Sequence, residues 1–325
     1  MYTTRGTVSD EVILTGDNFI LPGKSSISIL PARSETGIVF ERPRSMGRSS
    51  LQVKLDSDSY FPYRNLLGAR YMVVSEGSPS KGNIVAYVAE HLISAMWTSG
   101  ITDAVVRLNS GPNIPCMGQG IENMYRLLFN SRDDLKTQLP VYEVNKNVLY
   151  YMGAGVYDGK KPFSYMGVSQ VETDDNLLKM EIKESQFEDL PDFDQDSLVI
   201  EDVYSELENH LRARPLGRIA TPFKRGLHRL GSKCSFFSGI SDENYVNVRN
   251  LGMTTDEIAN LMLEKYRVGA NEHLAHTAYA DFFGELHTVF PGIIRGKFEF
   301  ANLNHFTRME ALNMLKSQDI IQRVE

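Results

Sequence analysis

The stretch AEHLISAMWTSGITDAVVRLNSGPNIPCMGQG, residues 89–120, passes from a helical pattern to an extended one and then to a loop. From about Ile84 the apolar positions recur at helical spacing, and Gly100 is the predicted stop. Next, DAVVRLNSG (103–111) is typical of a strand, and GPNIPCMGQG (111–120) is a glycine- and proline-rich loop. IENMYRLLFNS (121–131) then predicts a second helix. This order of strand and helix indicates an α+β unit.

On the amino-terminal side, short apolar runs separated by glycines predict strands: EVILTG (11–16), SSISIL (25–30), TGIVFER (36–42) and LGARYMVVSEG (67–77). On the other side, the polar segment RDDLKTQLP (132–140) separates the two halves. The length of 325 residues suits two domains. We therefore predict one domain over 1–136 and another over 137–325.

The second half repeats the same order. VYEVNKNVLYYMGAGVYDG (141–159) predicts strands, and KESQFEDLPDFDQDS (183–197) predicts an acidic surface loop. Helices are expected over 200–213, over 252–266 and in the histidine-rich stretch, with a strand at IIRGKFEF (293–300) and a closing helix from His305 to about Leu315. Two similar α+β domains follow from this order.

Bulk composition narrows the function. Hydrophobic residues make up 42% and charged residues 23%, as in a globular protein, and the net charge is −7. An acidic chain without a basic block argues against a nucleic-acid partner. Cys116 and Cys234 lie far apart and predict reduced thiols. Glu90 and His91 interrupt the most apolar stretch, so we expect no transmembrane segment and a cytoplasmic protein.

The stretch NEHLAHTAYADFFGELH, residues 271–287, carries three histidines, an aspartate and two glutamates. His273 and His276 are neighbours on a helical face, as are Asp281 and Glu285. His276 and Asp281 are five residues apart, which separates them on an ideal α-helix. The stretch therefore indicates either a metal site or the solvated face of an amphipathic helix. With no cysteine pair at metal-binding spacing, any metal would use His, Asp and Glu ligands.

Glu90 and His91 could complete such a site. A histidine on a helix supplies an imidazole to zinc, and an adjacent glutamate can take a proton from water. The alternative is a half-buried histidine beside a solvated glutamate.

Residues 89–120 resemble the zinc-dependent UDP-3-O-acyl-N-acetylglucosamine deacetylases of lipid A biosynthesis. ILPARSETGIVFER (29–42) is similar to that family's Pro-Ala-x-x-x-Thr-Gly strand pair. Further landmarks follow in order: ARPLGR (213–218), RGLHRLGS (225–232), NEHLAH (271–276), DFFGEL (281–286) and FEFANLNHF (298–306). The resemblance runs from about residue 3 to 316. It implies two α+β domains, each a helix pair packed on a β-sheet, with the active site at the domain interface.

The resemblance also implies roles for individual residues. Glu90 matches the general base, and the zinc ligands are His91, His276 and Asp281. His305 matches the general acid or oxyanion-stabilising group, with Glu285 in place of an aspartate to orient it. The family's aspartate lies four residues after its histidine, so Asp281 is one residue late, a rotation of roughly 100°. A π-helical turn would absorb that extra residue. His273 is a substitute ligand.

These matches predict a zinc-dependent deacetylase that removes the N-acetyl group of a UDP-linked 3-O-acylated glucosamine, as a monomer. Four positions depart from the family: Thr277 replaces a lysine, Pro215 a threonine, Gly118 an aspartate and Asn304 a glycine. Each lost hydrogen-bond donor would cost roughly 2.7–4 kcal/mol of transition-state stabilisation. A deacetylase-like binding or regulatory protein without catalysis, or a deacetylase of a different sugar amide, are therefore alternatives.

Overall fold

The computed structural model describes residues 2–18, 23–43, 50–64, 70–79, 83–117, 120–154, 163–171, 178–183, 197–213, 216–217, 246–247 and 272–325. The chain divides into two compact units, Tyr2–Gln138 and the described residues from Leu139 onward. Each unit combines many strands with few helices, which is compatible with the α+β class. The predicted boundaries, 1–136 and 137–325, and an active site at a domain interface stay predictions.

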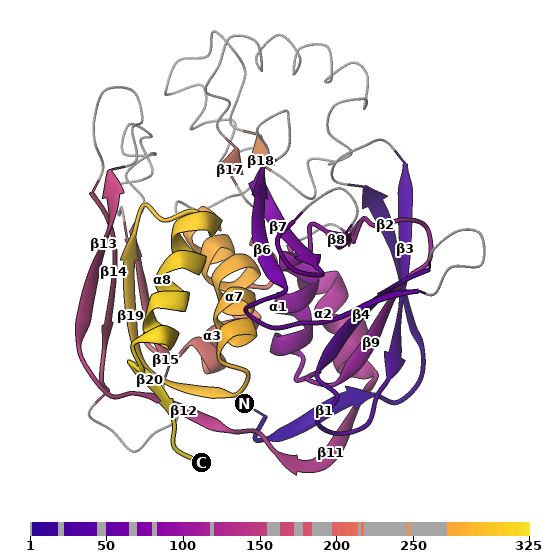
Figure 1. The fold of residues 1–325 in the computed structure, drawn as a ribbon, viewed down its shortest axis with the longest axis horizontal. Helices are drawn as coiled ribbons and strands as arrows, with labels where there is room; N and C mark the ends of the chain where they lie inside the picture. The colour runs from indigo at the N-terminus through magenta and orange to yellow at the C-terminus, as the bar shows by residue number, and fades with distance from the viewer. Residues whose placement is uncertain are drawn as a thin grey trace, which may run out of the picture. The chain divides into compact units, whose positions relative to one another are not determined.

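The first unit is built on a six-stranded sheet with the order β10-β2-β3-β9-β4-β5. Its strands are β2 (Val12–Asn18), β3 (Lys24–Pro31), β4 (Ile38–Arg42), β5 (Leu51–Lys54), β9 (Ala104–Leu108) and β10 (Pro115–Cys116). Burial alternates along β2, because successive side chains of a strand point to opposite faces. Helices α1 (Glu90–Thr98) and α2 (Glu122–Asn130) pack against each other, and α2 packs against β2 (Figure 1).

Two smaller sheets complete this unit. β1 (Thr4–Val8) pairs antiparallel with β11 (Arg132–Gln138). β6 (Tyr60–Arg64), β7 (Arg70–Ser75) and β8 (Ile84–Tyr87) form a three-stranded antiparallel sheet. The predicted strands over 11–16, 25–30, 36–42, 67–77 and 103–111 are all confirmed, as is the helix over 121–131.

One of the predictions for the first unit is wrong. The helix expected from about Ile84 begins only at Glu90, because Ile84–Tyr87 pairs with β7 as a strand. The polar segment over 132–140 contains the division between the two units, after Gln138, and its residues Arg132–Gln138 form the strand β11. Its polar side chains fit because most of them are partly or fully exposed.

The end of α1 shows why Gly100 stops this helix. The N–H of Gly100 donates to Trp97 O (3.1 Å), and that of Ile101 donates to Met96 O (2.8 Å). This is the Schellman pattern, which requires a left-handed residue after the helix. Gly100 adopts it with φ 75°. A glycine tolerates this conformation without steric cost, so the prediction of a stop here is confirmed.

The second unit is built on a seven-stranded sheet around β19 (Ile293–Ala301), which pairs antiparallel with β14 and parallel with β12 and β15. The strands beyond these neighbours continue the sheet, with β13 on β14, β20 on β12 and β16 on β15. Their bounds are β12 (Val141–Val144), β13 (Val148–Ala154), β14 (Phe163–Ser169), β15 (Leu178–Lys183), β16 (Ser197–Ile200) and β20 (Ile321–Arg323). A separate short pair is β17 (Leu216–Gly217) with β18 (Val246–Asn247).

The helices of this unit lie on one face of its sheet (Figure 1). They are α3 (Val203–His210), α6 (Glu272–His276), the π-helical turn η3 (Thr277–Phe282), α7 (Phe283–Val289) and α8 (His305–Ser317). Phe282 packs its ring edge-on against Phe298 and at a tilt against Phe300 of β19, with ring centroids 5.7 and 4.8 Å apart. This aromatic contact fixes η3 on the sheet. The predicted helix over 252–266 and most of the acidic loop over 183–197 lie outside the described residues.

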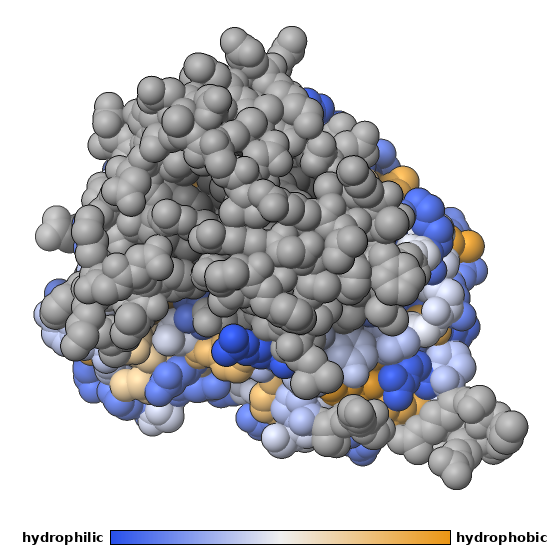
Figure 2. Space-filling model, turned by 90° about the horizontal axis from the view of Figure 1, so that it is seen from above, coloured by the Kyte–Doolittle hydropathy of each residue, from blue (hydrophilic) through white to orange (hydrophobic). Residues whose placement is uncertain are grey.

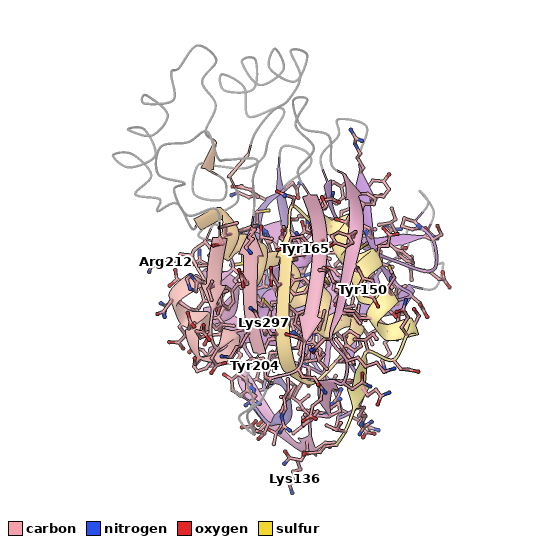
Figure 3. The ribbon with its side chains drawn as sticks, turned by 90° about the vertical axis from the view of Figure 1, so that its left-hand side faces the viewer. Lys136, Tyr150, Tyr165, Tyr204, Arg212 and Lys297 are labelled. Carbon is pink, nitrogen blue, oxygen red and sulfur yellow. The ribbon has the colours of Figure 1, made fainter. Side chains whose placement is uncertain are left out.

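The other face of the sheet carries charged and polar side chains together with the exposed Leu149, Tyr151 and Val199 (Figure 3). On it, Lys183 forms ion pairs with Glu181 (2.9 Å) and Glu299 (3.3 Å), and Lys297 forms one with Glu181 (3.1 Å). The hydroxyl of Tyr165 donates to Glu299. Elsewhere, the described residues visible in Figure 2 mix hydrophilic and hydrophobic side chains, as on most protein surfaces.

Candidate functional site

Glu90 stands at the first position of α1 and is buried, with 5% of its surface exposed. The backbone N–H of Met72 donates to Glu90 Oε2 at 3.1 Å and so fixes the carboxylate. Two residues earlier, Val88 has φ 60°, a left-handed conformation that is strained for a β-branched residue. This strained residue turns the chain from β8 into α1 and sets the direction in which Glu90 and His91 leave the backbone.

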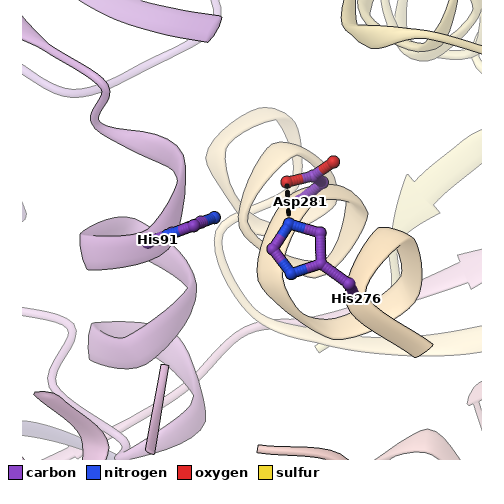
Figure 4. Close-up of side chains that lie close together, drawn as sticks. All are labelled: His91, His276 and Asp281. Carbon is purple, nitrogen blue, oxygen red and sulfur yellow. Dashed lines mark ion pairs between the residues drawn. The ribbon is translucent and has the colours of Figure 1, made fainter. Parts of the chain in front are cut away.

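His276 and Asp281 come together through the π-helical turn η3. In an α-helix, residues five apart lie roughly 140° from each other around the axis. A π-helix bonds residue i to i+5, so the same two residues lie on one side. The Nε2 atom of His276 is 3.5 Å from Asp281 Oδ1 (Figure 4). The π-helical turn therefore compensates for the five-residue spacing between His276 and Asp281, which is one residue longer than in the family that the chain resembles.

The tautomer of His276 follows from its other nitrogen. Nδ1 lies 3.1 Å from the carbonyl oxygen of Ala213, and a carbonyl oxygen only accepts, so Nδ1 carries the proton. In the neutral ring, Nε2 then presents a lone pair toward a carboxylate oxygen. Two such acceptors facing each other are stabilised by a cation between them, and a backbone carbonyl behind the ring is a common partner of metal-bound histidines.

Asp281 is an ionised carboxylate in this environment. Burial acts to raise its pKa, but the neighbouring His305 and Arg308 hold the pKa well below its usual range. Arg308 donates from Nη2 to Asp281 Oδ2 at 3.2 Å. The other oxygen, Oδ1, is the one that faces His276.

Glu285 and His305 form a buried pair beside it. Glu285 has no exposed surface, and its Oε1 lies 2.6 Å from His305 Nδ1. Burial acts to raise the pKa of Glu285, yet Arg308 and His305 lower it, so the carboxylate is ionised and accepts the Nδ1 proton. Burial opposes charge on His305, but Asp281 and Glu285 raise its pKa overall. The ring is thus held with Nε2 as the nitrogen that exchanges a proton.

Three side chains offer ligand atoms to a metal ion. His276 and Asp281 each contribute one such atom within the second unit, and His91 of the first unit is the candidate for the third (Figure 4). In a tetrahedral zinc site with bonds of roughly 2.0–2.1 Å, neighbouring ligand atoms are roughly 3.3–3.4 Å apart. The His276–Asp281 separation of 3.5 Å is close to that value. Two imidazoles and one carboxylate also suit zinc and leave a fourth position open.

Of the four positions at which the sequence departs from the family it resembles, the structure describes Thr277 and Asn304. Thr277 is buried within η3, with 6% of its surface exposed. Asn304 is the N-cap of α8: its side chain accepts from Phe306 N (3.0 Å), and Thr307 Oγ1 accepts from Asn304 N (3.0 Å). The asparagine therefore fixes the start of the helix that carries His305. Pro215, Gly118 and the side chain of His273 lie outside the described residues.

Sequence reasoning missed Arg308. Only 2% of its surface is exposed, and it contacts Asp281, Glu285 and His305 at once. Its position three residues after His305 is the signal that could have identified it, since residues three apart share a helical face.

Comparison with known proteins finds a weak similarity. No protein-family model matches the chain. A curated relative, the UDP-3-O-acyl-N-acetylglucosamine deacetylase of Chlamydia pneumoniae, is 29% identical over 122 residues. The match covers 38% of this chain and 39% of that protein, so it spans about two fifths of the relative's length. This similarity supports a distant relationship to that deacetylase, and with it a hydrolase. Among the described residues, the structure has no helix with the length and apolar character needed to cross a membrane.

Proposed function

We propose that this chain is a zinc-dependent amide hydrolase that removes the N-acetyl group from a UDP-linked 3-O-acylated glucosamine. The observation that carries the proposal is the π-helical turn, which places His276 Nε2 at 3.5 Å from Asp281 Oδ1 despite their five-residue separation. An ordinary α-helix would turn these side chains apart. His91 is the third proposed ligand, and the donor set fits zinc.

Zinc held by His91, His276 and Asp281 would supply a Lewis acid that polarises the amide carbonyl and lowers the pKa of water. Glu90 takes the proton from the attacking water, and the Met72 N–H fixes the position of its buried carboxylate. His305 donates a proton from Nε2 to the leaving amine or supports the developing oxyanion. Glu285 accepts from Nδ1 of His305 and thereby fixes the tautomer that this role requires.

The substrate class is inferred from the printed name of the Chlamydia pneumoniae relative, a deacetylase acting on a UDP-linked acylated amino sugar. A role in lipid A biosynthesis, a cytoplasmic location and a monomeric state belong to the same proposal. A close variant, a deacetylase of a different sugar amide, keeps the same site and changes only the substrate.

A binding protein without catalysis is the second candidate. Thr277 favours it, because the resemblance expects a lysine at this position and a buried threonine supplies no positive charge to a reacting carbonyl. Under this alternative the site could hold metal and sugar but would not turn over.

Metal content and amide hydrolysis test the proposal together. Protein purified without chelators should contain one zinc and release acetate from the UDP-linked substrate. The Asp281→Asn variant should lose zinc, Glu90→Gln should keep zinc and lose hydrolysis, and Glu310→Gln, on the exposed side of α8, should match the wild type. Absence of zinc after reconstitution would end the proposal, and zinc without hydrolysis of any tested sugar amide would select the binding protein.

A further inference from the structure

Arg308 is a buried cation that the roles assigned so far do not use. It lies in the first turn of α8, three residues after His305, and 3% of its side chain is exposed. At this depth the guanidinium cannot reach a substrate from its own position. Any effect it has on the reaction must act through the residues it contacts.

Every part of the guanidinium has an acceptor. Nε donates to Glu285 Oε2 (2.7 Å) and Nη2 donates to Glu285 Oε1 (3.0 Å), which is a bidentate pair. Nη1 donates to Leu303 O (3.2 Å), and the second N–H of Nη2 reaches Asp281 Oδ2 (3.2 Å). The planar fork of arginine fits this set, whereas the ammonium of lysine is a single point of charge.

The short contact between Arg308 and His305 shows how the guanidinium determines which acceptor the Nδ1 proton of His305 binds. Nη2 lies 2.9 Å from His305 Nδ1, but a guanidinium has no acceptor and Nδ1 already donates to Glu285. The two donors therefore converge on one oxygen, Glu285 Oε1. This arrangement leaves Nδ1 no alternative partner and directs Nε2 of His305 away from the Glu285 pair.

The contact with Asp281 has a separate consequence. Arg308 occupies Oδ2, and Oδ1 is left on the side of His276. A carboxylate held in this way offers one oxygen to a cation and cannot rotate to offer both. Outer-shell partners of this kind orient metal ligands, and their loss typically lowers metal affinity or activity by roughly 10–100-fold.

We propose that Arg308 is a positioning residue that fixes Asp281 as a one-oxygen metal ligand and His305 as the proton donor that acts through Nε2, through one shared guanidinium. The inference rests on the proposed function. It adds to that function a residue linking the metal ligand to the acid–base pair, so that neither can move without the other.

The test compares Arg308→Lys with the wild type in three measurements: zinc affinity by competition with a chromogenic chelator, kcat and KM for amide hydrolysis, and thermal unfolding by circular dichroism. Arg308→Lys keeps the charge but not the fork. It should weaken zinc binding by roughly tenfold or more and lower kcat by roughly 10–100-fold. KM should change by less than about twofold, because the fork does not touch substrate. The folded fraction should equal that of the wild type.

Two further variants complete the design. Arg295→Met removes another arginine of the same unit, one paired with Glu143 at 2.6 Å, and should leave zinc affinity and kcat unchanged. Arg308→Met should destabilise the fold as well, because it leaves a buried carboxylate without its partner. The inference is overturned if Arg308→Lys binds zinc and turns over like the wild type, if its losses match a smaller folded fraction, or if Arg295→Met shows the same losses.

The outcomes also separate this inference from the proposed function. Wild-type protein that binds no zinc ends both. Wild-type protein that binds zinc and hydrolyses the amide, alongside an Arg308→Lys variant that does the same, ends only the role of Arg308.

Discussion

At the residue scale, His287 is a buried base that packs against the rings of Phe283 and Tyr204. Its Nδ1 donates to Phe283 O (2.8 Å), its Nε2 faces the hydroxyl of Tyr204 (3.4 Å), and its ring packs on Phe283 with centroids 4.1 Å apart. The Tyr204 hydroxyl also accepts from Ile294 N (3.0 Å), which ties α7 to α3 and β19. This network requires a neutral imidazole, with Nε2 as an acceptor.

The buried neutral state of His287 makes stability depend on pH. Burial lowers the pKa of His287 from 6.5 to about 4. The folded-state pKa is therefore below the unfolded value, so the unfolded chain binds the proton first and stability falls as pH drops from 6.5 toward 4. At pH 5 this amounts to about 2 kcal/mol. Urea unfolding of the wild type and His287→Gln from pH 7.5 to 4.5 measures it.

The His287→Gln variant should be less stable at pH 7.5 but lose less stability than the wild type on acidification. Parallel pH curves for the two proteins would contradict the assignment. Carboxylates titrate in both proteins, so the difference between the curves isolates the histidine.

The residues of the candidate site were accessible to sequence reasoning to different degrees. Glu90, His91, His276, Asp281, Glu285 and His305 follow from spacing and from the resemblance, because these residue types carry recognisable chemistry. Arg308 and the Ala213 carbonyl did not follow. An arginine in a helix usually indicates a solvated face, and a backbone carbonyl has no sequence signature, so both emerge only once the helices are placed.

At the element scale, the π-helical turn η3 accommodates one extra residue and still keeps His276 and Asp281 on the same side of the helix. Removing Ala280 should allow an α-helix to run through, with the histidine and aspartate then four residues apart and still on one face. Zinc binding should survive this deletion. Inserting one alanine after Ala280 should abolish zinc binding, because another residue adds roughly 100° of rotation. Zinc titration of both variants decides the matter.

If both the deletion and the insertion variants lose zinc binding while their circular dichroism is unchanged, the π-helical turn itself is required to place the two ligands. Retention in both would mean that the helix tolerates any register, and the role given to η3 would be wrong.

Gly100 allows a second prediction at this scale. An alanine Cβ there would come 2.4 Å from Tyr2 Cδ2 and 2.6 Å from Arg132 Nε, in a backbone with φ 75°. Gly77 has a similar φ of 73°, with nothing within 4 Å of its Cβ position. Gly100→Ala should therefore destabilise by more than the roughly 1 kcal/mol expected from strain alone, and Gly77→Ala by about that amount. Denaturant midpoints provide the comparison, and equal losses would contradict the role of the Tyr2 and Arg132 contacts.

Element boundaries were less predictable than element types. The start of α1 was missed because Ile84–Tyr87 has the apolar content of either a strand or a helix, and pairing with β7 decides it. β11 was missed because its side chains are polar; its partner β1 lies some 130 residues earlier along the chain. Local pattern carries no information about a partner that distant.

At the scale of the whole molecule, zinc should act as a stabilising ligand. A ligand that binds only the folded state adds RT ln(1 + [L]/Kd), which is about 2.7 kcal/mol at a free concentration 100 times Kd. The melting temperature of the wild type and of Glu90→Gln should rise with zinc, because Glu90 is not a ligand. Asp281→Asn should not respond. Scanning calorimetry with and without zinc makes the measurement.

A zinc-dependent rise in all three proteins would indicate binding elsewhere on the chain. No rise in the wild type would remove the metal from the proposal altogether.

The central strand β19 has a consequence for synthesis on the ribosome. Residues 293–301 lie between β14 and two parallel neighbours that are made more than a hundred residues earlier. Until β19 emerges, those neighbours leave the exit tunnel with open edges, which are prone to pair with other nascent chains. Completion of the second sheet therefore waits for the synthesis of β19 and of β20 (Ile321–Arg323). Ribosome stalling or truncation shortly before position 293 should expose this unit to aggregation and to chaperone capture.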